Sequence, residues 1–415
     1  MPALISTILG RAQGTAPTFD FMKSADIVIV GGGMVGLALA GLLKDVDCQI
    51  KIIEKNTPKF DADTIYHRVS AINASSQKIL EQIGAFQHIP AQRLSPYTEM
   101  KVWEKDSFAN IHFDNNDNEI KQLGLSQLGF ILENAVIQHA LWQQVSQQAN
   151  VEYIIAAPQT LGVSENGAFL TLDNGEMLSA KLVVGADGAN SWVRNQMKMP
   201  LTSKDYQHTA LVCNVKTTEK HGKTARQIFA EDSIFAFLPM ADEHLCSIVW
   251  SLPPNKANEL KNASEAEFNK ALTIAFDNQL GLCEVQSLRE IYPLAARFCR
   301  DFAQPRIALI GDAAHTIHPL AGLGVNLGFA DAKTLANEIQ KQLVNNQDIG
   351  EYRHLRQFER ERKAQAMKLL ATMEGLKQLF DGNHPLKKLF RGIGLSLTNQ
   401  LPFVKKQLIQ QAIYL

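Results

Sequence analysis

The hydrophobic pattern alternates between short β-branched runs and longer segments with apolar residues at helical spacing. Residues 26–30 (DIVIV) are typical of a buried parallel strand, residues 34–44 predict a helix, and residues 49–54 (QIKIIE) predict a second strand. Together they predict a βαβ unit with the usual right-handed crossover. We therefore expect an α/β protein.

Further along the chain the pattern changes. Residues 132–149 predict a helix, and residues 169–184 predict two strands joined by the turn Asp173-Asn174-Gly175. Residues 209–215, 234–238 and 245–250 are short strand-like runs of the kind found in an antiparallel sheet, which Pro253-Pro254 ends. Ser264 and Glu267 then form a capping box before apolar residues that recur every four positions, which predicts a covering helix.

Residues 306–310 (RIALI) return to the α/β pattern, and the chain is helix-rich from about residue 331. This predicts a Rossmann-like domain interrupted by an inserted antiparallel-sheet domain and followed by a helical C-terminal region. The expected Rossmann-like domain combines residues 22–95, 120–200 and 300–345. Residues 96–119 with 201–299 form the expected inserted domain, residues 346–415 the C-terminal helices, and residues 1–21 a disordered extension before an alternative start at Met22.

Composition excludes several classes of protein. The 415 residues are 46% hydrophobic and 20% charged with a net charge of −1, so the basic excess of a typical nucleic-acid-binding protein is absent. No apolar run is long enough to span a membrane. The five cysteines form no C-x-x-C pair, which favours a reducing cytoplasm and thiols that act as small hydrophobic residues. No zinc-type spacing of Cys and His occurs, so we expect no metal.

A dinucleotide-binding motif connects the first strand and helix. Gly31 permits the turn, Gly33 lets a pyrophosphate approach the backbone, and Gly36 lets the helix pack closely. The N-terminus of the helix offers free N–H groups to the phosphates. Glu54 ends the second strand, where an acidic residue accepts hydrogen bonds from a ribose diol. This motif alone does not separate FAD from NAD.

Two later motifs make that separation. Asp187-Gly188 follows one predicted strand and Gly311-Asp312 follows another. With these three motifs in this order, the chain resembles the para-hydroxybenzoate hydroxylase-like FAD monooxygenases over nearly its whole length after residue 24. The resemblance implies that Asp312 bonds the ribitol of FAD and that the Asp187 segment lies by the pyrophosphate. A nicotinamide cofactor, NADH or NADPH, would then bind transiently, because there is only one dinucleotide motif.

Three further segments are similar to the ubiquinone-biosynthesis hydroxylases: residues 68–73 (RVSAIN), Glu133-Asn134, and residues 311–328 (GDAAHTIHPLAGLGVNLG). The sequence departs from many members at Leu323, where they carry glutamine. Arg68 would meet the FAD phosphates and Asn134 the flavin side. The residues expected to face the flavin ring are Pro319, Gly322, Gly324, Val325 and Asn326. The helix that begins near Asn326 would favour negative charge on the reduced ring.

Several of these residues have a plainer interpretation. Arg68 could form a surface ion pair, and Asn134 could simply cap a helix. For His315 we favour a structural role at a helix start over that of a general base. The aromatic residues suggested as substrate walls could equally be core: Phe235, Phe237 and Trp250.

The resemblance predicts an FAD-dependent monooxygenase that uses NAD(P)H and O2 to hydroxylate the aromatic ring of a polyprenylated phenol or quinol in ubiquinone biosynthesis. One alternative is a related FAD hydroxylase or reductase acting on another aromatic or isoprenoid metabolite. Another is a catalytically silent FAD-binding scaffold subunit of a quinone-biosynthesis complex, for which Leu323 is the hint.

The C-terminal tail carries basic residues among many apolar ones and no acidic residue after Gly382: Lys387, Lys388, Arg391, Lys405 and Lys406. A basic amphipathic segment can lie on anionic lipid, so one interpretation is peripheral contact with the inner face of the membrane. The alternative is a packing helix, or one that joins a homo-oligomer or a biosynthetic complex.

Overall fold

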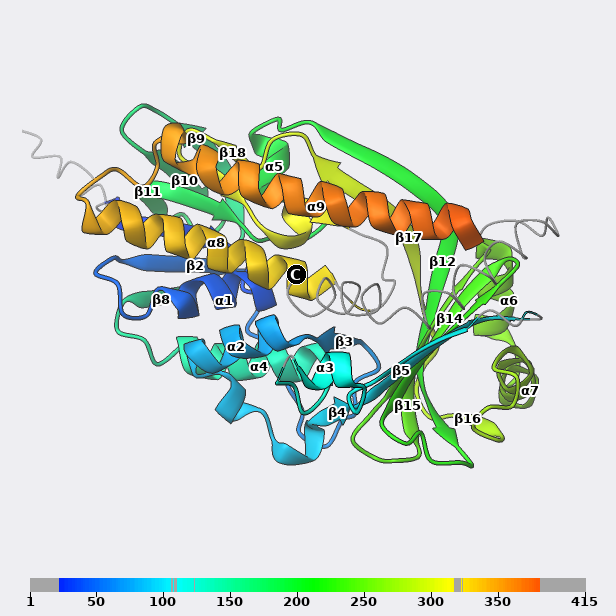
Figure 1. Cartoon of the computed structure of the whole chain (residues 1–415). Helices are drawn as coiled ribbons and strands as arrows, with labels where there is room; N and C mark the ends of the chain where they lie inside the picture. Colours follow the sequence, from blue (N-terminus) through cyan, green and yellow to red (C-terminus); the bar gives the residue numbers. More distant parts are fainter. Residues whose placement is uncertain are drawn as a thin grey trace, which may run out of the picture.

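The computed structural model describes residues 22–105, 107, 110–122, 124–316, 322 and 324–380. The expected disordered extension at 1–21 and the tail after residue 380 lie outside this range. The described residues form sheets of eight, nine and three strands, with helices packed between and around them (Figure 1). The mixed α/β class predicted from sequence is confirmed.

The eight-stranded sheet is the Rossmann-like part. Its order is β18-β19-β11-β1-β2-β8, and β10 and β9 continue from β11. β1 pairs in parallel with β2 and with β11, and β10 turns back antiparallel on β11. The strands are β1 (Lys23–Val30), β2 (Ile50–Glu54), β8 (Val151–Ile155), β9 (Pro158–Val163), β10 (Ala168–Leu172), β11 (Met177–Gly185), β18 (Ala303–Gln304) and β19 (Ile307–Leu309).

Helices cover this sheet because its central strands are apolar on both faces. Four residues at the end of β1 are at most 3% exposed: Ile27, Val28, Ile29 and Val30. The helices of this part are α1 (Met34–Leu42), α2 (Ala74–Ile83), α4 (Asn134–Val145), α5 (Trp192–Gln196) and α8 (Gly324–Val344). The βαβ unit predicted at the start of the chain is present, and α1 lies against α4 and α8.

A small sheet links the two larger ones. It has the order β3-β7-β4, with β3 (Val69–Ile72), β7 (Gly129–Glu133) and β4 (Ser95–Tyr97). The first residue of β3 follows Arg68 directly, and the last residue of β7 precedes Asn134. Two of the segments singled out in the sequence therefore meet at one end of this sheet, since Val69 pairs with Glu133.

The nine-stranded sheet has the order β20-β17-β12-β15-β14-β13-β5-β6, with β16 beside β12. It is antiparallel except where β13 pairs with β5. The strands are β5 (Glu99–Glu104), β6 (Asn110–Asp114), β12 (Leu201–Thr217), β13 (Thr224–Ala230), β14 (Ser233–Pro239), β15 (Leu245–Leu252), β16 (Cys283–Val285), β17 (Glu290–Cys299) and β20 (His315–Thr316).

Helices α6 (Pro254–Asn262) and α7 (Glu265–Ala275) cover one face of this sheet. The capping box at Ser264 and Glu267 is present in both directions, as predicted. Pro254 does more than end the strand, because it is the first residue of α6, where a missing N–H costs nothing. β12 is also longer than its predicted core of 209–215.

Helix α9 (Tyr352–Phe380) runs from the nucleotide-binding part toward the nine-stranded sheet (Figure 1). Near its far end Lys204 Nζ of β12 lies 2.6 Å from Glu374 Oε1. Within the described residues, no helix is both long and apolar enough to cross a membrane. All five cysteines are buried and unpaired.

Candidate active site

The glycine-rich turn has the geometry that the motif predicts. Gly31 has φ of +112°, and a Cβ atom there would overlap the carbonyl of Ala186. A Cβ atom on Gly36 would overlap the carbonyl of Gly31. At Gly33 a Cβ atom would meet nothing within 4 Å. Gly31 and Gly36 are therefore required by packing, whereas Gly33 keeps open space in front of the helix N-terminus.

Glu54 lies at this turn. Its Oε2 accepts a hydrogen bond of 2.8 Å from the backbone N–H of Gly32. The neighbouring hydroxyl of Tyr153 in β8 is buried without a hydrogen-bond partner, and burial raises the pKa of Tyr153, with the charge of Glu54 adding to the effect. A carboxylate and an unpaired hydroxyl thus stand together at the carboxyl edge of the sheet.

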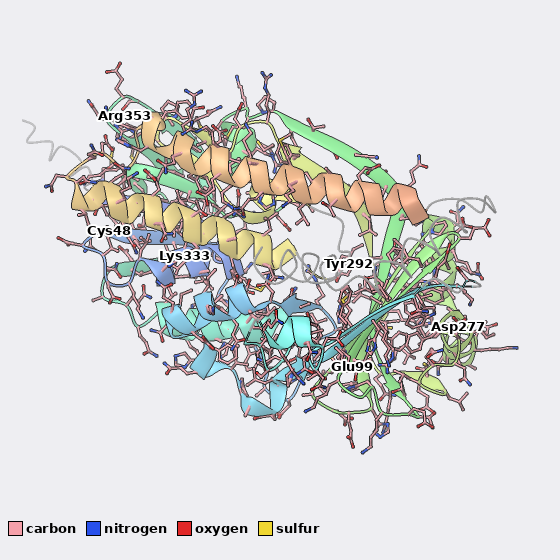
Figure 2. All side chains as sticks on the ribbon, in the orientation of Figure 1. Cys48, Glu99, Asp277, Tyr292, Lys333 and Arg353 are labelled. Atoms are coloured by element: carbon pink, nitrogen blue, oxygen red, sulfur yellow. The ribbon has the colours of Figure 1, made fainter. Side chains whose placement is uncertain are left out.

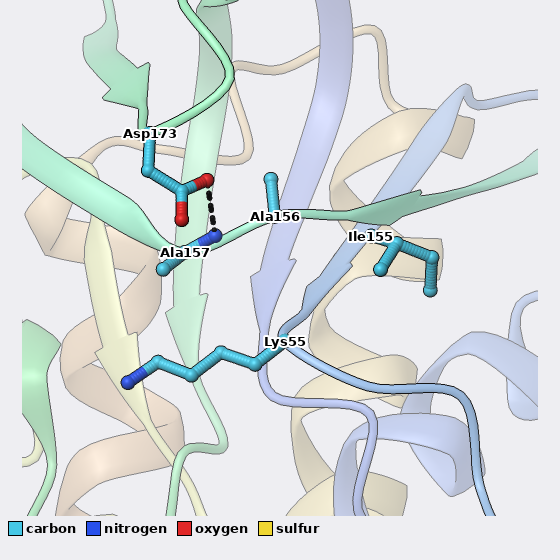
Figure 3. Close-up of a pocket in the computed structure, with 5 residues that line it drawn as sticks. All are labelled: Lys55, Ile155, Ala156, Ala157 and Asp173. Carbon is cyan, nitrogen blue, oxygen red and sulfur yellow. Dashed lines mark hydrogen bonds between the residues drawn. The ribbon is translucent and has the colours of Figure 1, made fainter.

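A shallow pocket lies beyond them, at the ends of β2 and β8 (Figure 3). Asp173 holds its floor in place, because Oδ1 accepts a hydrogen bond of 2.8 Å from Ala157 N–H. Five residues line it: Lys55, Ile155, Ala156, Ala157 and Asp173. In a Rossmann-like sheet this edge, outside the carboxyl ends of the strands, is where ligands bind.

The Asp187-Gly188 segment follows β11. Asp187 Oδ2 accepts hydrogen bonds from Trp192 N–H (2.7 Å) and Val193 N–H (3.0 Å), so it holds the start of α5. Its other oxygen, Oδ1, is buried and has no partner. Gly188 has φ of +79° and open space at its Cβ position. Asp187 Oδ2 therefore stabilises the start of α5. Asp187 Oδ1 has no hydrogen-bond partner, and it lies next to Gly188, which has no side chain.

Arg194 joins the two later motifs, a role the sequence did not suggest. Its guanidinium donates to the carbonyl of Ala189 and to the carbonyl of Ala313, each at 2.9 Å. The residue is only 3% exposed. Ala313 lies 119 residues further along the chain, so only the folded structure shows this contact.

The Gly311-Asp312 motif forms the short helix η3 (Gly311–Ala313). Gly311 has φ of +61°, and its N–H donates to Asp331 Oδ2 at 2.9 Å. Asp331 is fully buried and also contacts His315 Nε2 and Arg362 Nε, each at 2.6 Å. Burial alone would raise the pKa of Asp331, but His315 and Arg362 outweigh it and hold the pKa below its usual value.

This network settles the position of His315. It lies in β20 rather than at a helix start, is 2% exposed, and has a buried carboxylate as its partner. The sequence pointed to His315 but missed Asp331 and Arg362. Each is a charged residue within an otherwise amphipathic helix. A single sequence does not show whether such a residue faces the core or the solvent.

Asp312 has a different environment from Asp331. Its side chain is exposed, yet the surrounding protein desolvates it enough to raise its pKa. His315, Arg68 and Arg297 oppose that rise through their positive charge. A carboxylate that is accessible and lies among cations is suited to bind ligand hydroxyl groups.

Arg68 precedes β3 and is exposed. Its guanidinium carbon lies 5.2 Å from the centre of the Tyr292 ring. This contact with the nine-stranded sheet was not foreseen, and it makes Arg68 more than an isolated surface cation.

The side chain of Asn134 does not cap its own helix. It accepts a hydrogen bond of 2.7 Å from the hydroxyl of Ser70, while Glu133 is the N-cap residue of α4. The Glu133 carboxylate is buried and contacts Arg93 Nη1 at 3.0 Å, although burial still raises the pKa of Glu133. Asn134 thereby connects β3 to α4 at the end of the small sheet.

Helix α8 begins at Gly324-Val325, beside β3. The side chain of Asn326 donates to the carbonyl of Ala71 (2.7 Å) and accepts from the N–H of Asn73 (3.1 Å). Its side chain is therefore engaged by the protein, and the residue is 0% exposed. Gly322 has φ of +64°, and its Cβ position is 3.0 Å from Ala71 N. His318, Pro319 and Leu323 lie outside the described residues.

The three aromatic residues suggested as substrate walls pack in the core under α7. Phe235, Phe237 and Trp250 are 2%, 0% and 6% exposed, and the ring centres of Phe237 and Phe276 are 3.6 Å apart. Side chains alternate along a strand, so their neighbours point to the opposite face. There Leu238 and Val249 pack with Ala71 of β3. The core interpretation of the three aromatics fits this arrangement.

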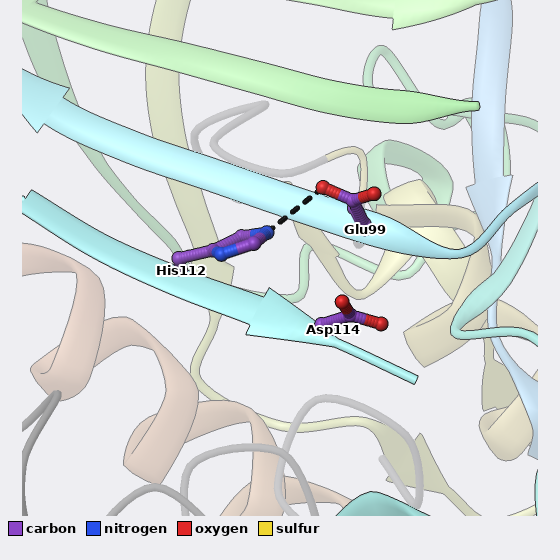
Figure 4. A group of neighbouring side chains, drawn as sticks. All are labelled: Glu99, His112 and Asp114. Atoms are coloured by element: carbon purple, nitrogen blue, oxygen red, sulfur yellow. Dashed lines mark hydrogen bonds and ion pairs between the residues drawn. The ribbon is translucent and has the colours of Figure 1, made fainter. Parts of the chain in front are cut away.

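One group of side chains could in principle hold a cation. Glu99, His112 and Asp114 lie together on β5 and β6 (Figure 4). His112 Nε2 is 2.9 Å from Glu99 Oε2, and Lys101 Nζ is 3.5 Å from the same oxygen. The three side chains are partly exposed, and the Lys101 ammonium already pairs with Glu99. This is the arrangement of an ordinary surface ion-pair cluster.

Similarity to known proteins identifies the family to which the chain belongs. A family model described as an FAD binding domain matches residues 24–373. The 3-demethoxyubiquinol 3-hydroxylase of Escherichia coli (strain K12) is 34% identical over 400 residues, which covers 94% of this chain and 99% of that protein. The chain belongs to the FAD-dependent monooxygenases of ubiquinone biosynthesis. The family recognised from the sequence motifs is thereby confirmed.

A second relative leads to the same family. The mitochondrial ubiquinone biosynthesis monooxygenase COQ6 of Xenopus tropicalis is 32% identical, with 97% of this chain and 96% of that protein covered. In fold, this monooxygenase is similar to p-nitrophenol 4-monooxygenase PnpA from Pseudomonas putida DLL-E4, with a TM-score of 0.76, 18% identity and coverage of 94% and 99%.

The site of this monooxygenase fits FAD. Three glycines in the segments that the sequence singled out have open space at their Cβ positions: Gly33, Gly188 and Gly324. Two buried polar atoms without partners, Asp187 Oδ1 and the Tyr153 hydroxyl, lie beside the same backbone segments. FAD, which offers hydroxyl and phosphate groups, supplies the chemistry that these atoms lack.

Proposed function

We propose that this monooxygenase hydroxylates the aromatic ring of a polyprenylated phenol or quinol in ubiquinone biosynthesis, with NAD(P)H as reductant and O2 as oxidant. The observation that carries the proposal is the near-complete coverage of the E. coli 3-demethoxyubiquinol 3-hydroxylase at 34% identity. When bound, FAD supplies the redox and oxygen chemistry.

The residues of the chain then have distinct tasks. Gly31, Gly33 and Gly36 with Glu54 hold the adenosine and pyrophosphate end, and Asp312 with Arg68 holds the ribitol and phosphates. Asp187 and Gly188 border the pyrophosphate. The amide of Asn134 and the backbone of Gly322, Gly324, Val325 and Asn326 face the flavin ring. This assignment is supported by the open glycine positions and by the exposure of Asp312.

The substrate domain in this proposal comprises residues 96–119 and 201–299. Its wall is the face of the nine-stranded sheet that carries Leu238 and Val249, because the other face is filled by α6 and α7. A ring held between this face and the flavin is shielded from water and oriented for reaction.

The test is the mass of quinone-related lipids in cells that lack the gene, compared with the same cells after complementation. We expect a prenylated ring that lacks one oxygen to accumulate and to disappear on complementation. An unchanged quinone profile in cells without a redundant hydroxylase would contradict the proposed pathway and would favour the alternative of another aromatic metabolite.

We also infer that the protein works at the cytoplasmic face of the inner membrane through its basic C-terminal segment, since each basic residue near an anionic surface contributes about 1 kcal/mol. Sedimentation with vesicles that contain anionic lipid tests this. Binding should fall when Lys387, Lys388 and Arg391 are changed to glutamine, and equal binding of the variant would contradict it.

A further inference from the structure

One face of the nine-stranded sheet is only partly covered by the nucleotide-binding part. Leu238 on this face packs against Ala71 of β3. The next row of side chains on the same face is accessible. It includes Val102 of β5, Ala236 of β14 and Val249 of β15, which are partly exposed although each of these strands has a neighbour on both sides. The middle of this face is therefore not filled as a core would be.

Gln227 of β13 lies within this row. It pairs with Ala236 on one side and with Val102 on the other. Its neighbour Ile228 packs in the core under α7. Because side chains alternate along a strand, the side chain of Gln227 points to the opposite, accessible face.

This face is turned toward the cofactor site. Val249 and Tyr292 pack against the same apolar cluster. Figure 2 shows Tyr292 on the side of the sheet nearer to the nucleotide-binding part, whereas Asp277 lies on the side of α7. The backbone nitrogen of Ala71 is 3.0 Å from the Cβ position of Gly322. The accessible row thus adjoins the segment that is expected to face the flavin ring.

The side-chain amide of Gln227 is buried without a partner. The residue is only 6% exposed, and its side chain makes no hydrogen bond or ion pair with any described residue. Two other buried polar residues of the same face do have partners. Ser247 Oγ donates to the carbonyl of His67 at 2.8 Å, and Asn214 Nδ2 donates to the carbonyl of Ile65 at 3.3 Å. Since a buried polar group is normally hydrogen-bonded, the amide of Gln227 lacks a partner that a ligand can supply.

The chemistry of the row limits what that ligand is. A side-chain amide offers an N–H donor and a carbonyl acceptor. The carbonyl can accept the hydrogen of a phenolic hydroxyl, while the N–H donates to an oxygen atom on the adjacent ring carbon. The other side chains of the row, Val102, Ala236 and Val249, are apolar and suit the ring itself. One polar side chain in an apolar wall fixes the orientation of a ring.

We propose that Gln227 recognises the oxygen substituents of the aromatic substrate, so that the preferred ring carries a hydroxyl group next to a second oxygen substituent. This rests on the function proposed above. Gln227 binds and orients the ring and exchanges no proton with it. An earlier ring oxygenation must then supply the substrate, because two adjacent ring carbons already carry oxygen before this enzyme acts.

The experiment measures ring selectivity with FAD-loaded protein. The two probes are short prenylated phenols that differ only beside the hydroxyl group, where one carries a methoxy group and the other an ethyl group of similar size. Dissociation constants come from the change in flavin absorbance without NAD(P)H, and KM comes from turnover. Wild type should favour the methoxy probe by roughly 10-fold or more, since a buried amide left without its partner weakens binding by about that factor.

Three variants separate recognition from folding. Gln227→Met removes the amide at similar volume, and it should bring the ratio of the two dissociation constants close to one. Thr209→Val is the matched control, because Thr209 is also 6% exposed but shares the face of Leu211, which packs under α6 and α7. It should keep the wild-type ratio. Ala236→Leu fills the space beside Gln227 and should raise both dissociation constants, while FAD content and thermal unfolding stay near those of wild type.

Two results would overturn the role of Gln227: a ratio near one in wild type, or a wild-type ratio in Gln227→Met. If Gln227→Met does not fold, Ala236→Leu carries the test, and unchanged dissociation constants in that variant would contradict the accessible row as the substrate wall. Failure of the proposed function looks different, because wild type would then hydroxylate neither probe with NAD(P)H and O2, whatever its binding ratio.

Discussion

Arg362 of α9 and Asp331 of α8 form an ion pair with an Nε–Oδ1 distance of 2.6 Å and side chains only 2% and 0% exposed. The second oxygen of Asp331 accepts the N–H of Gly311. Asp331 of α8 therefore holds the backbone next to Asp312, and Arg362 of α9 in turn holds Asp331. Removing one member leaves a charge buried without its partner.

Replacing Arg362 by methionine should destabilise the protein by about 3–5 kcal/mol, since the buried Asp331 loses a partner. It should also weaken FAD binding, because Gly311 and Asp312 lose their support. Denaturant unfolding and flavin titration measure the two effects. Glu374 lies on the same helix as Arg362 and forms an exposed ion pair with Lys204 of β12. Glu374→Gln, which breaks that pair, should lower the unfolding free energy by about 1 kcal/mol or less. Equal effects of the two variants would contradict the account.

The same network predicts a pH dependence. The pKa of Asp331 is lowered in the folded protein, so the unfolded chain binds more protons as the solution becomes acidic. The stabilisation is fully present above the unfolded pKa of about 3.9 and is lost as pH falls through the lower folded pKa. The difference in Tm between wild type and Asp331→Asn should thus narrow below about pH 4. A difference that stays constant into that range would count against the assignment.

The glycines of the first motif should separate binding from folding. Gly33→Ala meets no atom within 4 Å, so the unfolding free energy should stay near that of wild type, while the added methyl group obstructs the pyrophosphate and weakens FAD binding. Gly31→Ala should lower both, because of its positive φ and its overlap with Ala186. FAD binding by Gly33→Ala as tight as by wild type would contradict the assignment of the space at Gly33 to the pyrophosphate.

Opposite faces of the nine-stranded sheet should respond differently to substitution. Phe237→Ala removes a fully buried ring and should cost about 3–5 kcal/mol with little effect on KM. Val249→Phe adds bulk to the other face and should raise KM for the aromatic substrate while FAD content is unchanged. Steady-state kinetics with flavin quantification decide between the faces. If KM rose only in Phe237→Ala, the substrate would instead contact the face of the sheet that carries the aromatic residues.

Local chemistry explains what the sequence could predict. The turn at Gly31, the strand that ends at Glu54 and the capping box at Ser264 each depend on residues within a few positions of one another. Such features are legible in one chain because backbone geometry and capping are local. The family motifs added the order of the segments around Asp187 and Asp312.

Long-range pairs explain what the sequence could not predict. Arg194 with Ala313, Asp331 with Arg362, and Tyr292 with Arg68 each join elements brought together only by the tertiary fold. The face of a strand poses the same problem. Phe235 and Phe237 alternate correctly, but their side of the sheet depends on where α7 packs.

The most direct test of the central claim uses purified FAD-loaded protein, NADH or NADPH, a short prenylated phenol and isotopically heavy O2. We predict substrate-stimulated, oxygen-dependent consumption of the nicotinamide and a ring product that carries one heavy oxygen atom from O2. Tight flavin binding with no stimulated consumption and no labelled product would contradict the assignment and would instead support a catalytically silent FAD-binding subunit.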